Sequence, residues 1–391
     1  MMSEWNIGTI SEVCSLVTDG SHYSPKSCDS GEYMVSVKDF KGFGFDFSNC
    51  KHISSDDYEK MKASGCIPEH GDILIGKDGA RFFEDIIIYN QPEKPALLSS
   101  IAILRCNPDI ILPQFLYYIC KNPVFKKDVR DNYGSGSAIP RIVLKDFKRM
   151  TISYPDLAEQ RRIVASLVAI DDRIALNTAI NENLEQQAQA IYAQMFIESA
   201  EESWEIGSLS DIAVITMGQS PKGDTFNETG EGAVFYQGRT DFGFRFPTRR
   251  LYTTEPKRIA LCGDALMSVR APVGDLNVAY EECCIGRGLA AIHSKDNHQS
   301  FVLYTLFTLK KQLDVFNGEG TVFGSINKES HNSMEITIPP RELMDRFEST
   351  VSPIDRAIRN NYEEICRLQA IRDTLLPKLM NGEIDVSAVR I

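Results

Sequence analysis

Two long stretches of the chain share one pattern of hydrophobic and polar positions. In Leu157–Ile197 and in Arg341–Met380, apolar or small residues recur at spacings of three and four, which keeps one face of a helix apolar along its length. Each stretch therefore predicts a long helix whose apolar seam faces a partner helix. The seam residues are Ile163, Leu167, Ile170, Ile174, Leu184, Ala188, Ile191 and Met195 in the first stretch, and Phe347, Val351, Ile354, Ile358, Ile365, Leu368, Leu375 and Leu379 in the second.

Polar residues interrupt both seams, and asparagines do so near mid-length in each. Asn177 and Asn181 interrupt the first, and Asn361 and Arg372 interrupt the second. Adding 184 carries seven of the eight residues of the first seam onto the second, with Ala188 falling on Arg372, and carries Asn177 onto Asn361 (361 − 177 = 184). In an antiparallel pair these two asparagines would meet at the centre, where a buried Asn pair fixes register and orientation. We therefore predict an antiparallel coiled coil with an Asn177–Asn361 contact.

The segments before the helices are also repeated. Glu4–Val13 matches Ser203–Ile212 at an offset of 199, including both tryptophans of the chain. Gly71–Ile75 matches Gly263–Met267 at an offset of 192, so insertions and deletions separate the copies. The chain thus reads as an internal duplication with a pseudo-two-fold axis. Its segments are a first domain (1–155), a first long helix (156–199), a second domain (200–339), and a second long helix with a C-terminal tail (340–391).

Each domain mixes short strands with helices. Strands are predicted at β-branched or aromatic runs between Gly, Pro and Asn turns, and each domain ends in a strand that leads into proline. Because strands and helices do not alternate regularly, the pattern favours an α+β domain over a parallel βαβ fold. The predicted strands are Tyr33–Val37, Ile86–Tyr89, Ile101–Arg105, Met150–Pro155, Ala265–Val269, Leu289–Ile292 and Met334–Pro340, and the predicted helices are Gln114–Cys120 and Phe301–Leu309.

Composition narrows the class of protein. The chain has 391 residues, 43% of them hydrophobic and 25% charged, which is typical of a globular protein with more than one core. No apolar run reaches the ~20 residues of a membrane helix, and the N-terminus lacks the features of a signal peptide. Ten scattered cysteines and six histidines form neither a disulfide framework nor a zinc motif. We expect a cytoplasmic protein that holds no metal and contacts no membrane.

Charge gives no simple argument for nucleic acid. The formal net charge is −12, and residues 1–155 carry 18 Lys and Arg against 20 Asp and Glu. Residues 200–339 carry 13 against 18. Since phosphate binding requires positive charge, any DNA-binding face must be a local patch.

Several motifs, in order, resemble the specificity subunit of type I restriction–modification systems. Thr18–Pro25 (TDGSHYSP) is similar to the D-G-[ST]-H-x-x-P stretch of the family's target recognition domains. Pro155–Ile163, with Glu159-Gln160, is similar to the P-x-x-E-Q-x-x-I start of the first long helix, and Leu376–Ile384 to the end of the second. The resemblance covers the whole chain. The second half departs from it, with Met217–Pro221 (MGQSP) replacing the D-G-S-H stretch and no E-Q pair after Pro340.

The resemblance implies a fold and a function. Two α+β target recognition domains would read the two halves of a split, asymmetric DNA target, and the two antiparallel helices would separate them as a ruler. From Ile163 to Met195 such a helix rises ~48 Å. The resemblance further implies double-stranded DNA, two methyltransferase subunits and restriction (translocase) subunits as partners. S-adenosylmethionine, ATP and Mg²⁺ would belong to those partners, and the chain itself would be non-catalytic.

Candidate DNA contacts follow from the chemistry of readout. Arg and Lys suit guanine, Asn and Gln suit adenine, and all of these suit phosphate. The candidates lie in turn-like stretches: Ser21, His22, Lys26, Lys38, Lys41, Lys77 and Arg81 in the first domain, and Lys222, Gln237, Arg239, Arg245, Arg249, Arg250 and Arg270 in the second. A solvated surface position is the default for each.

Three other motifs have bland interpretations. Asn122-Pro123-Val124-Phe125 is similar to the N-P-P-F motif of adenine methyltransferases, but it lacks the second proline and a nearby glycine-rich donor loop, which favours a turn between helices. The glycine-rich stretches 134–137 and 318–321 lack the ending of a phosphate loop. The aromatic stretches Phe40–Phe47 and Phe242–Phe246 favour core and turn packing over stacking on bases.

Two functions from other classes stay open at this stage. A stand-alone DNA methyltransferase would need a donor-binding glycine motif and an N-P-P-[FY] motif. A bilobed coiled-coil adaptor that binds only proteins would suit the acidic charge, although not the D-G-S-H stretch. Neighbouring genes for a methyltransferase and an ATP-dependent translocase would favour the specificity subunit.

Overall fold

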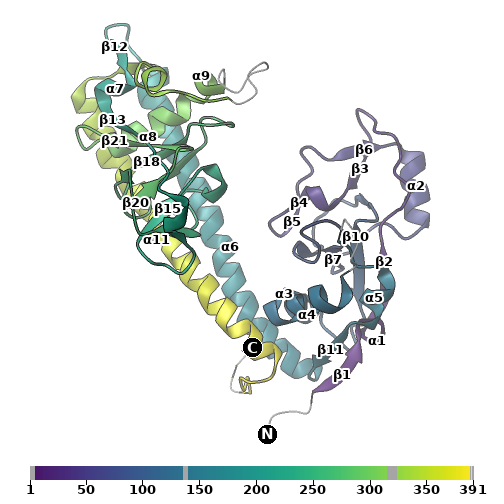
Figure 1. Cartoon of the computed structure of the whole chain (residues 1–391). Helices are drawn as coiled ribbons and strands as arrows, with labels where there is room; N and C mark the ends of the chain where they lie inside the picture. The colour runs from purple at the N-terminus through teal and green to yellow at the C-terminus, as the bar shows by residue number, and fades with distance from the viewer. Residues whose placement is uncertain (1–4, 135–139, 315–323, 388, 390–391) are drawn as a thin grey trace. The chain divides into compact units, whose positions relative to one another are not determined.

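The chain forms two compact units that share the long helices. The computed structural model describes residues 5–134, 140–314, 324–387 and 389. One unit comprises Met1–Leu176 and Glu364–Ile391, and the other comprises Asn177–Glu363 (Figure 1). Each unit is thus a globular domain together with a segment from each long helix. Most of the two glycine-rich stretches, 135–137 and 318–321, lies outside the described residues.

The two long helices form where the apolar spacing predicts them. Helix α6 spans Leu157–Ala193 and continues into a π-helical turn at Gln194–Glu198, and helix α11 spans Arg341–Met380. The Asp156 carboxylate accepts a hydrogen bond from the Glu159 amide (2.8 Å), which caps the start of α6. At the far end of α11, Gly382 has a φ of +70° and lies against the Trp5 ring. The tryptophan predicted to begin the repeat therefore packs where the second helix ends.

The first unit is built on a four-stranded antiparallel sheet. Its strand order is β2-β10-β7-β8. The unit also contains a three-stranded sheet with the order β6-β3-β9 and the strand pair β1–β11. Only β3 and β9 pair in parallel among the strands described in this unit. The strands are β1 Asn6–Thr9, β2 Cys14–Asp19, β3 Glu32–Val35, β4 Phe40–Lys41, β5 Gly44–Phe45, β6 Lys51–Ile53, β7 Ile73–Gly76, β8 Ile86–Ile88, β9 Ala96–Leu97, β10 Ile101–Cys106 and β11 Thr151–Tyr154; the helices are α1 Ile10–Val13, η1 Val37–Asp39, α2 Ser55–Ala63, α3 Pro113–Lys121, α4 Pro123–Tyr133 and α5 Leu144–Arg149.

The second unit repeats the order of the four-stranded sheet, but its other sheet has five strands in place of three. Its four-stranded sheet has the order β13-β21-β18-β19, a five-stranded sheet has the order β14-β16-β15-β20-β17, and β12 pairs with β22. The parallel pair β15–β20 corresponds to β3–β9, which supports the duplication. The strands are β12 Glu205–Ser208, β13 Ala213–Met217, β14 Phe226–Asn227, β15 Ala233–Tyr236, β16 Leu251–Thr253, β17 Ile259–Ala260, β18 Ala265–Ser268, β19 Leu276–Val278, β20 Cys283–Ile285, β21 Leu289–Ser294 and β22 Glu335–Ile338; the helices are α7 Leu209–Ile212, η3 Gly223–Thr225, η4 Arg239–Asp241, α8 Gln299–Thr308, α9 Lys310–Asp314 and α10 Lys328–Asn332.

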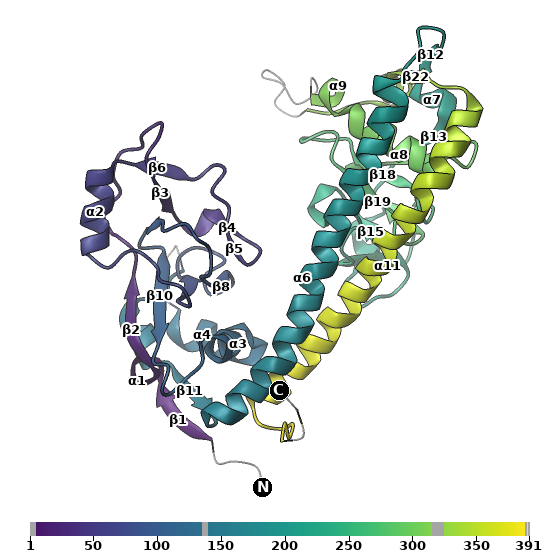
Figure 2. The same ribbon diagram turned by 180° about the vertical axis from the view of Figure 1, so that it is seen from behind.

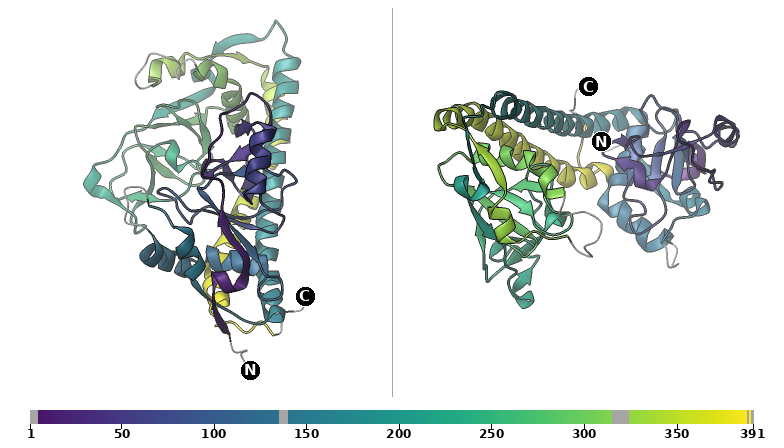
Figure 3. Two further views of the ribbon diagram at one scale, coloured as in Figure 1. Left: turned by 90° about the vertical axis from the view of Figure 1, so that its right-hand side faces the viewer. Right: turned by 90° about the horizontal axis from the view of Figure 1, so that it is seen from above.

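The helix seams belong to the domain cores. In the first unit, Ile163 and Leu167 of α6 and Leu379 of α11 are buried in the same cluster as the sheet residues. In the second unit, Ala188 of α6 and Phe347 of α11 are buried in the equivalent cluster. Figure 2 shows the α11 segment lying alongside the α6 segment in the second unit, and the second view in Figure 3 agrees. Burial of both seams explains why their apolar spacing was so regular.

Polar contacts between the helices correct one predicted pair. In the first unit, Arg173 of α6 pairs with Glu364 of α11 (2.8 Å). In the second unit, the Asn361 amide donates to the Asn181 oxygen (2.8 Å), and the Asn181 amide donates to the Ile358 carbonyl (3.2 Å). Asn361 therefore meets Asn181, one turn beyond the predicted partner Asn177. The side-chain nitrogen of Asn177 is buried without a hydrogen-bond partner among the described residues.

Candidate nucleic-acid interface

The predicted contacts of the first domain are mostly exposed. His22, Lys26, Lys38, Lys41 and Arg81 lie on the surface, and Ser21 is half-buried with its hydroxyl bonded to the backbone of Tyr23. Lys41 pairs with Asp46 (2.8 Å), and Arg81 pairs with Asp85 (2.8 Å). Such exposed pairs are weak and can open towards a ligand.

Lys77 is the exception in this domain. Its side chain is only 7% exposed, and its ammonium lies 3.4 Å from Asp19 and 3.5 Å from Asp78. A buried ammonium between two carboxylates is held in place, because moving it would leave those charges unpaired. Lys77 therefore lies inside the domain in this structure, and a direct contact with DNA is not supported.

Most arginines of the second domain are ion-paired on the surface. Arg239 pairs with Asp275 (2.7 Å), Arg250 pairs with Asp241 (3.0 Å), and Arg249 pairs with Glu281. These pairs lower the positive potential that the three arginines could otherwise offer to phosphate. Three further candidates of this domain are exposed: Lys222, Gln237 and Arg270.

Arg245 is buried and connects the second domain to both long helices. It is 4% exposed, donates to Glu185 of α6 (3.0 Å) and to the Tyr304 hydroxyl (3.0 Å), and pairs with Asp355 of α11. Burial alone would lower the pKa of Arg245, but the adjacent Tyr304, Asp355 and Glu185 raise it above its usual value. Arg245 is therefore a structural residue here, and its prediction as a DNA contact is not supported.

A glycine–arginine–glycine turn gathers several candidates of the second domain. The turn Gly286–Gly288 joins β20 to β21 and carries the exposed Arg287. The Gly288 amide donates to the Gln237 carbonyl (3.2 Å), the Val269 amide donates to the Gly288 carbonyl (2.9 Å), and the Arg287 amide donates to the Ser220 hydroxyl (3.3 Å). Gln237, Arg270 and Arg287 thus come from adjacent backbone segments.

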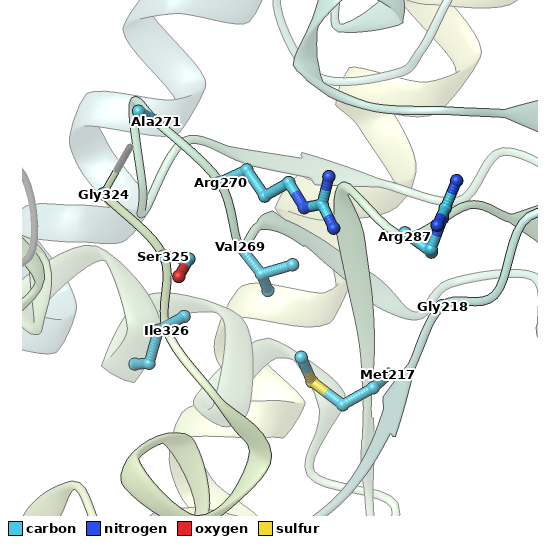
Figure 4. Close-up of a pocket in the computed structure, with 9 residues that line it drawn as sticks. All are labelled: Met217, Gly218, Val269, Arg270, Ala271, Arg287, Gly324, Ser325 and Ile326. Carbon is cyan, nitrogen blue, oxygen red and sulfur yellow. The ribbon is translucent and has the colours of Figure 1, made fainter. Parts of the chain in front are cut away.

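A hollow of about 580 Å³ lies at this turn. Arg270 and Arg287 border it, and Met217, Val269 and Ile326 supply apolar lining (Figure 4). Figure 4 shows the Arg270 side chain extending in the direction of Arg287. Within the described parts of the chain, neither guanidinium has an ion pair or other side-chain partner. We call the two arginines and their hollow the arginine site.

Glycines permit the tight packing of the arginine site. A Cβ at Gly288 would lie 2.6 Å from the Gln237 carbonyl oxygen, and a Cβ at Gly218 would lie 2.1 Å from the Gly286 carbonyl oxygen. No other residue fits these positions without moving the backbone. The turn that carries Arg287 is therefore held on two sides.

The first unit has the same backbone arrangement with different side chains. Gly20 occupies the position of Gly218, and a Cβ there would lie 2.3 Å from the Leu97 carbonyl oxygen. The isolated bridge between Asp78 and Arg141 matches the bridge between Arg270 and Ser325. Asp78 thus replaces Arg270, and Ser99 replaces Arg287 (287 − 188 = 99, from the offset of β10 to β21). The D-G-S-H stretch and its divergent counterpart therefore occupy equivalent places.

Arg287 was missed from the sequence. A lone arginine between two glycines gave no periodic signal, and the second domain lacks the motif that drew attention to Ser21 and His22. A weak signal existed in the alignment of strands: the residue after the Cys283–Ile285 run is glycine and is followed by arginine, whereas the first domain has Leu98-Ser99 there.

The remaining motifs have structural roles. Asn122 ends α3 and caps α4, since its oxygen accepts from the Val124 amide (3.0 Å); the helix is thus interrupted at Asn122, while Pro123, Val124 and Phe125 already belong to α4. Phe45 and Phe246 are buried, whereas Phe43 and Phe244 are exposed, which leaves stacking on bases untested. Across the described ranges, no group of His, Cys, Asp and Glu is arranged to hold a metal, and no helix has the length and hydropathy of a membrane span.

Comparison with known families identifies both halves. The family described as "Type I restriction modification DNA specificity domain" matches residues 2–186 and 201–365. The putative type I restriction enzyme MjaX specificity subunit of Methanocaldococcus jannaschii is 27% identical and aligns with 98% of this chain and 94% of its own length. The type I restriction enzyme HindI specificity subunit of Haemophilus influenzae is 22% identical, over 80% of this chain and 86% of its own.

Solved structures give similar matches. The S subunit of a type I restriction–modification system from M. genitalium has a TM-score of 0.59 at 16% identity and covers 96% of both chains, which supports the fold. The HsdS subunit of Thermoanaerobacter tengcongensis is 25% identical over 97% of both chains, with a TM-score of 0.37.

Proposed function

The chain belongs to the family of type I restriction–modification DNA specificity subunits, and we propose that it reads a split, asymmetric DNA target for a larger complex. In this proposal each unit recognises one half of the target in double-stranded DNA. As a specificity subunit the chain supplies recognition, and catalysis belongs to other subunits. Methyltransferase subunits, two per chain as the resemblance implies, and restriction subunits would then bring S-adenosylmethionine, ATP and Mg²⁺, in the cytoplasm.

One observation carries the proposal. The two halves share the order of the four-stranded sheet and a family match, yet they differ in charge at an equivalent backbone bridge: Asp78 in one half corresponds to Arg270 in the other. A duplicated scaffold with different side chains at one place suits two readers of two different base sequences. Two reading domains on one chain also replace the two-fold symmetry of a dimeric DNA-binding protein.

We further propose that the two long helices act as an antiparallel coiled coil between the readers. Their contacts support this arrangement, because residue numbers rise along α6 while they fall along α11: Arg173 meets Glu364, and Asn181 meets Asn361. The length of this coiled coil would set the spacing between the half-sites.

The decisive experiment is a map of methylated adenines in the source genome, with and without this gene. We expect one split motif with two different half-sites to lose methylation when the gene is deleted, and to regain it when the gene is returned. A genome whose methylation pattern is unchanged on deletion contradicts the proposal. The stand-alone methyltransferase and the protein-only adaptor gain no support from the family match, which runs through both halves.

A further inference from the structure

We infer that Arg270 and Arg287 form a guanine-reading site in the second half of the chain. This inference rests on the proposed function and adds to it the residues and the base. A guanine edge in the major groove offers two acceptors, O6 and N7, to the fork of one guanidinium. The second half-site of the target should therefore contain at least one essential G·C pair.

The first argument is charge. The other predicted surface arginines of the second domain, Arg239, Arg249 and Arg250, are each paired with a carboxylate. Arg270 and Arg287 project from adjacent backbone segments, and among the described residues no carboxylate lies within ion-pair distance of either. Two like charges that border one hollow create a local positive potential, and an electron-rich ligand relieves their repulsion.

The second argument is rigidity. Arg270 lies between two backbone hydrogen bonds, from Val269 to the Gly288 carbonyl (2.9 Å) and from Ala271 to the Gly324 carbonyl (2.8 Å). Arg287 lies between two closely packed glycines: a Cβ would lie 2.6 Å from the Gln237 carbonyl oxygen at Gly288 and 3.0 Å from the Gln237 Cα at Gly286. A phosphate needs only positive charge, which a free lysine such as Lys222 could supply. Guanidinium forks carried on a fixed backbone instead suit bidentate contact with a base edge, which depends on orientation.

The third argument is the contrast with the first unit. Asp78 replaces Arg270 there, and Ser99 replaces Arg287, while Asp78 lies beside the buried Lys77. A contact to the phosphate backbone would be needed equally in both halves, because every half-site has the same backbone. A difference at equivalent positions is instead expected of residues that read sequence.

The test uses the full chain in complex with its methyltransferase subunits. The target is first mapped by methylation, and duplexes are then made with each base pair of both half-sites replaced in turn. Binding is measured at several salt concentrations for the wild type, Arg287→Lys, Arg270→Lys and Arg287→Ser, the last being the residue of the first half. Because both arginines are exposed, thermal unfolding should match the wild type and thus controls for folding.

We expect each lysine variant to lose discrimination at one G·C pair of the second half-site. The loss should be roughly tenfold to a hundredfold, the size of one bidentate contact, with the salt dependence and the first half-site unchanged. Lysine variants that discriminate like the wild type, together with a uniform loss and shallower salt dependence in Arg287→Ser, would show a phosphate contact and overturn the inference. A mapped second half-site without an essential G·C pair also overturns it. A wild-type complex that recognises no split target contradicts the proposed function itself.

Discussion

His331 is an imidazole buried in the second unit, and we expect its protonation to destabilise that unit. It lies in α10, it is fully buried, and neither ring nitrogen has a hydrogen-bond partner among the described residues. Burial lowers the pKa of His331 to about 4. Its counterpart in the first half is Phe147 (331 − 184 = 147), which is also fully buried. The duplication thus shows which apolar side chain this position accepts.

Replacing His331 with phenylalanine should remove a pH dependence. Between pH 6.5 and about 4 the unfolded chain binds a proton at this residue and the folded chain does not, so the stability contribution present above pH 6.5 is lost as pH falls. The full loss is about 3 kcal/mol. Urea unfolding of wild type and His331→Phe at pH 7 and pH 5 measures the difference. The same pH dependence in both proteins would contradict the assignment.

Asn177 and Asn361 occupy equivalent positions in the two helices, but we expect replacing them with leucine to have opposite effects on the free energy of unfolding. The Asn177 amide nitrogen is buried without a described partner, so Asn177→Leu should raise the free energy of unfolding by about 1–3 kcal/mol. Asn361→Leu should lower it by a similar amount, because the Asn181 oxygen would lose its donor. Denaturant midpoints of the two variants give the comparison, and shifts of the same sign would show that the register is not as described.

At the scale of elements, Arg245 joins the loop before β16 to α6 and α11 through ion pairs with Glu185 and Asp355. Arg245→Met would leave Glu185 and Asp355 without their cation, and breaking a buried pair costs about 3–5 kcal/mol. The matched control is Arg249→Met, which breaks the exposed pair with Glu281 and should cost less than about 1 kcal/mol. Thermal unfolding and hydrogen exchange of the second unit measure both. Equal losses of stability in the two variants would mean that the buried Arg245 contacts stabilise the unit no more than the exposed pair does.

The contacts of Arg245 with α6 and α11 are a difference between the halves. Phe43 is equivalent in position to Arg245, because Phe43 follows Asp39 by four residues and Arg245 follows Asp241 by four residues. The Phe43 side chain is 60% exposed. It borders a groove with Tyr117, Tyr118 and Asp171, whereas Arg245 is buried against Glu185, Tyr304 and Asp355. The two domains therefore use different contacts to meet their helices, although their strand order is the same.

Elements were predictable where one period governs many residues. Helix α11 begins and ends where its apolar spacing does, and β10 and β21 lie within two residues of their predicted ends. Single contacts were not predictable, because they depend on how separate segments approach each other. The partner of Asn361 depends on how α6 and α11 are aligned against each other, and the burial of Lys77 and Arg245 depends on which distant segments cover them, so neither could be read from local sequence.

At the scale of the whole molecule, the proposed role of the coiled coil as a ruler can be tested by changing its length. Four residues inserted after Leu176 in α6 and four after Glu363 in α11 would lie between the Arg173–Glu364 contact and the Asn181–Asn361 contact on both helices. Each insertion adds about 6 Å, close to one helical turn. Both contacts should survive, since neither is interrupted.

We expect the methylation map of this variant to show the same two half-sites with one or two more base pairs between them, because B-DNA rises about 3.4 Å per base pair. The control is the same insertion in α6 alone, which shifts one seam against the other and should weaken the folded state. A changed half-site sequence would mean that the helices take part in readout. An unchanged spacing with full methylation would mean that the distance between half-sites is set by another part of the complex.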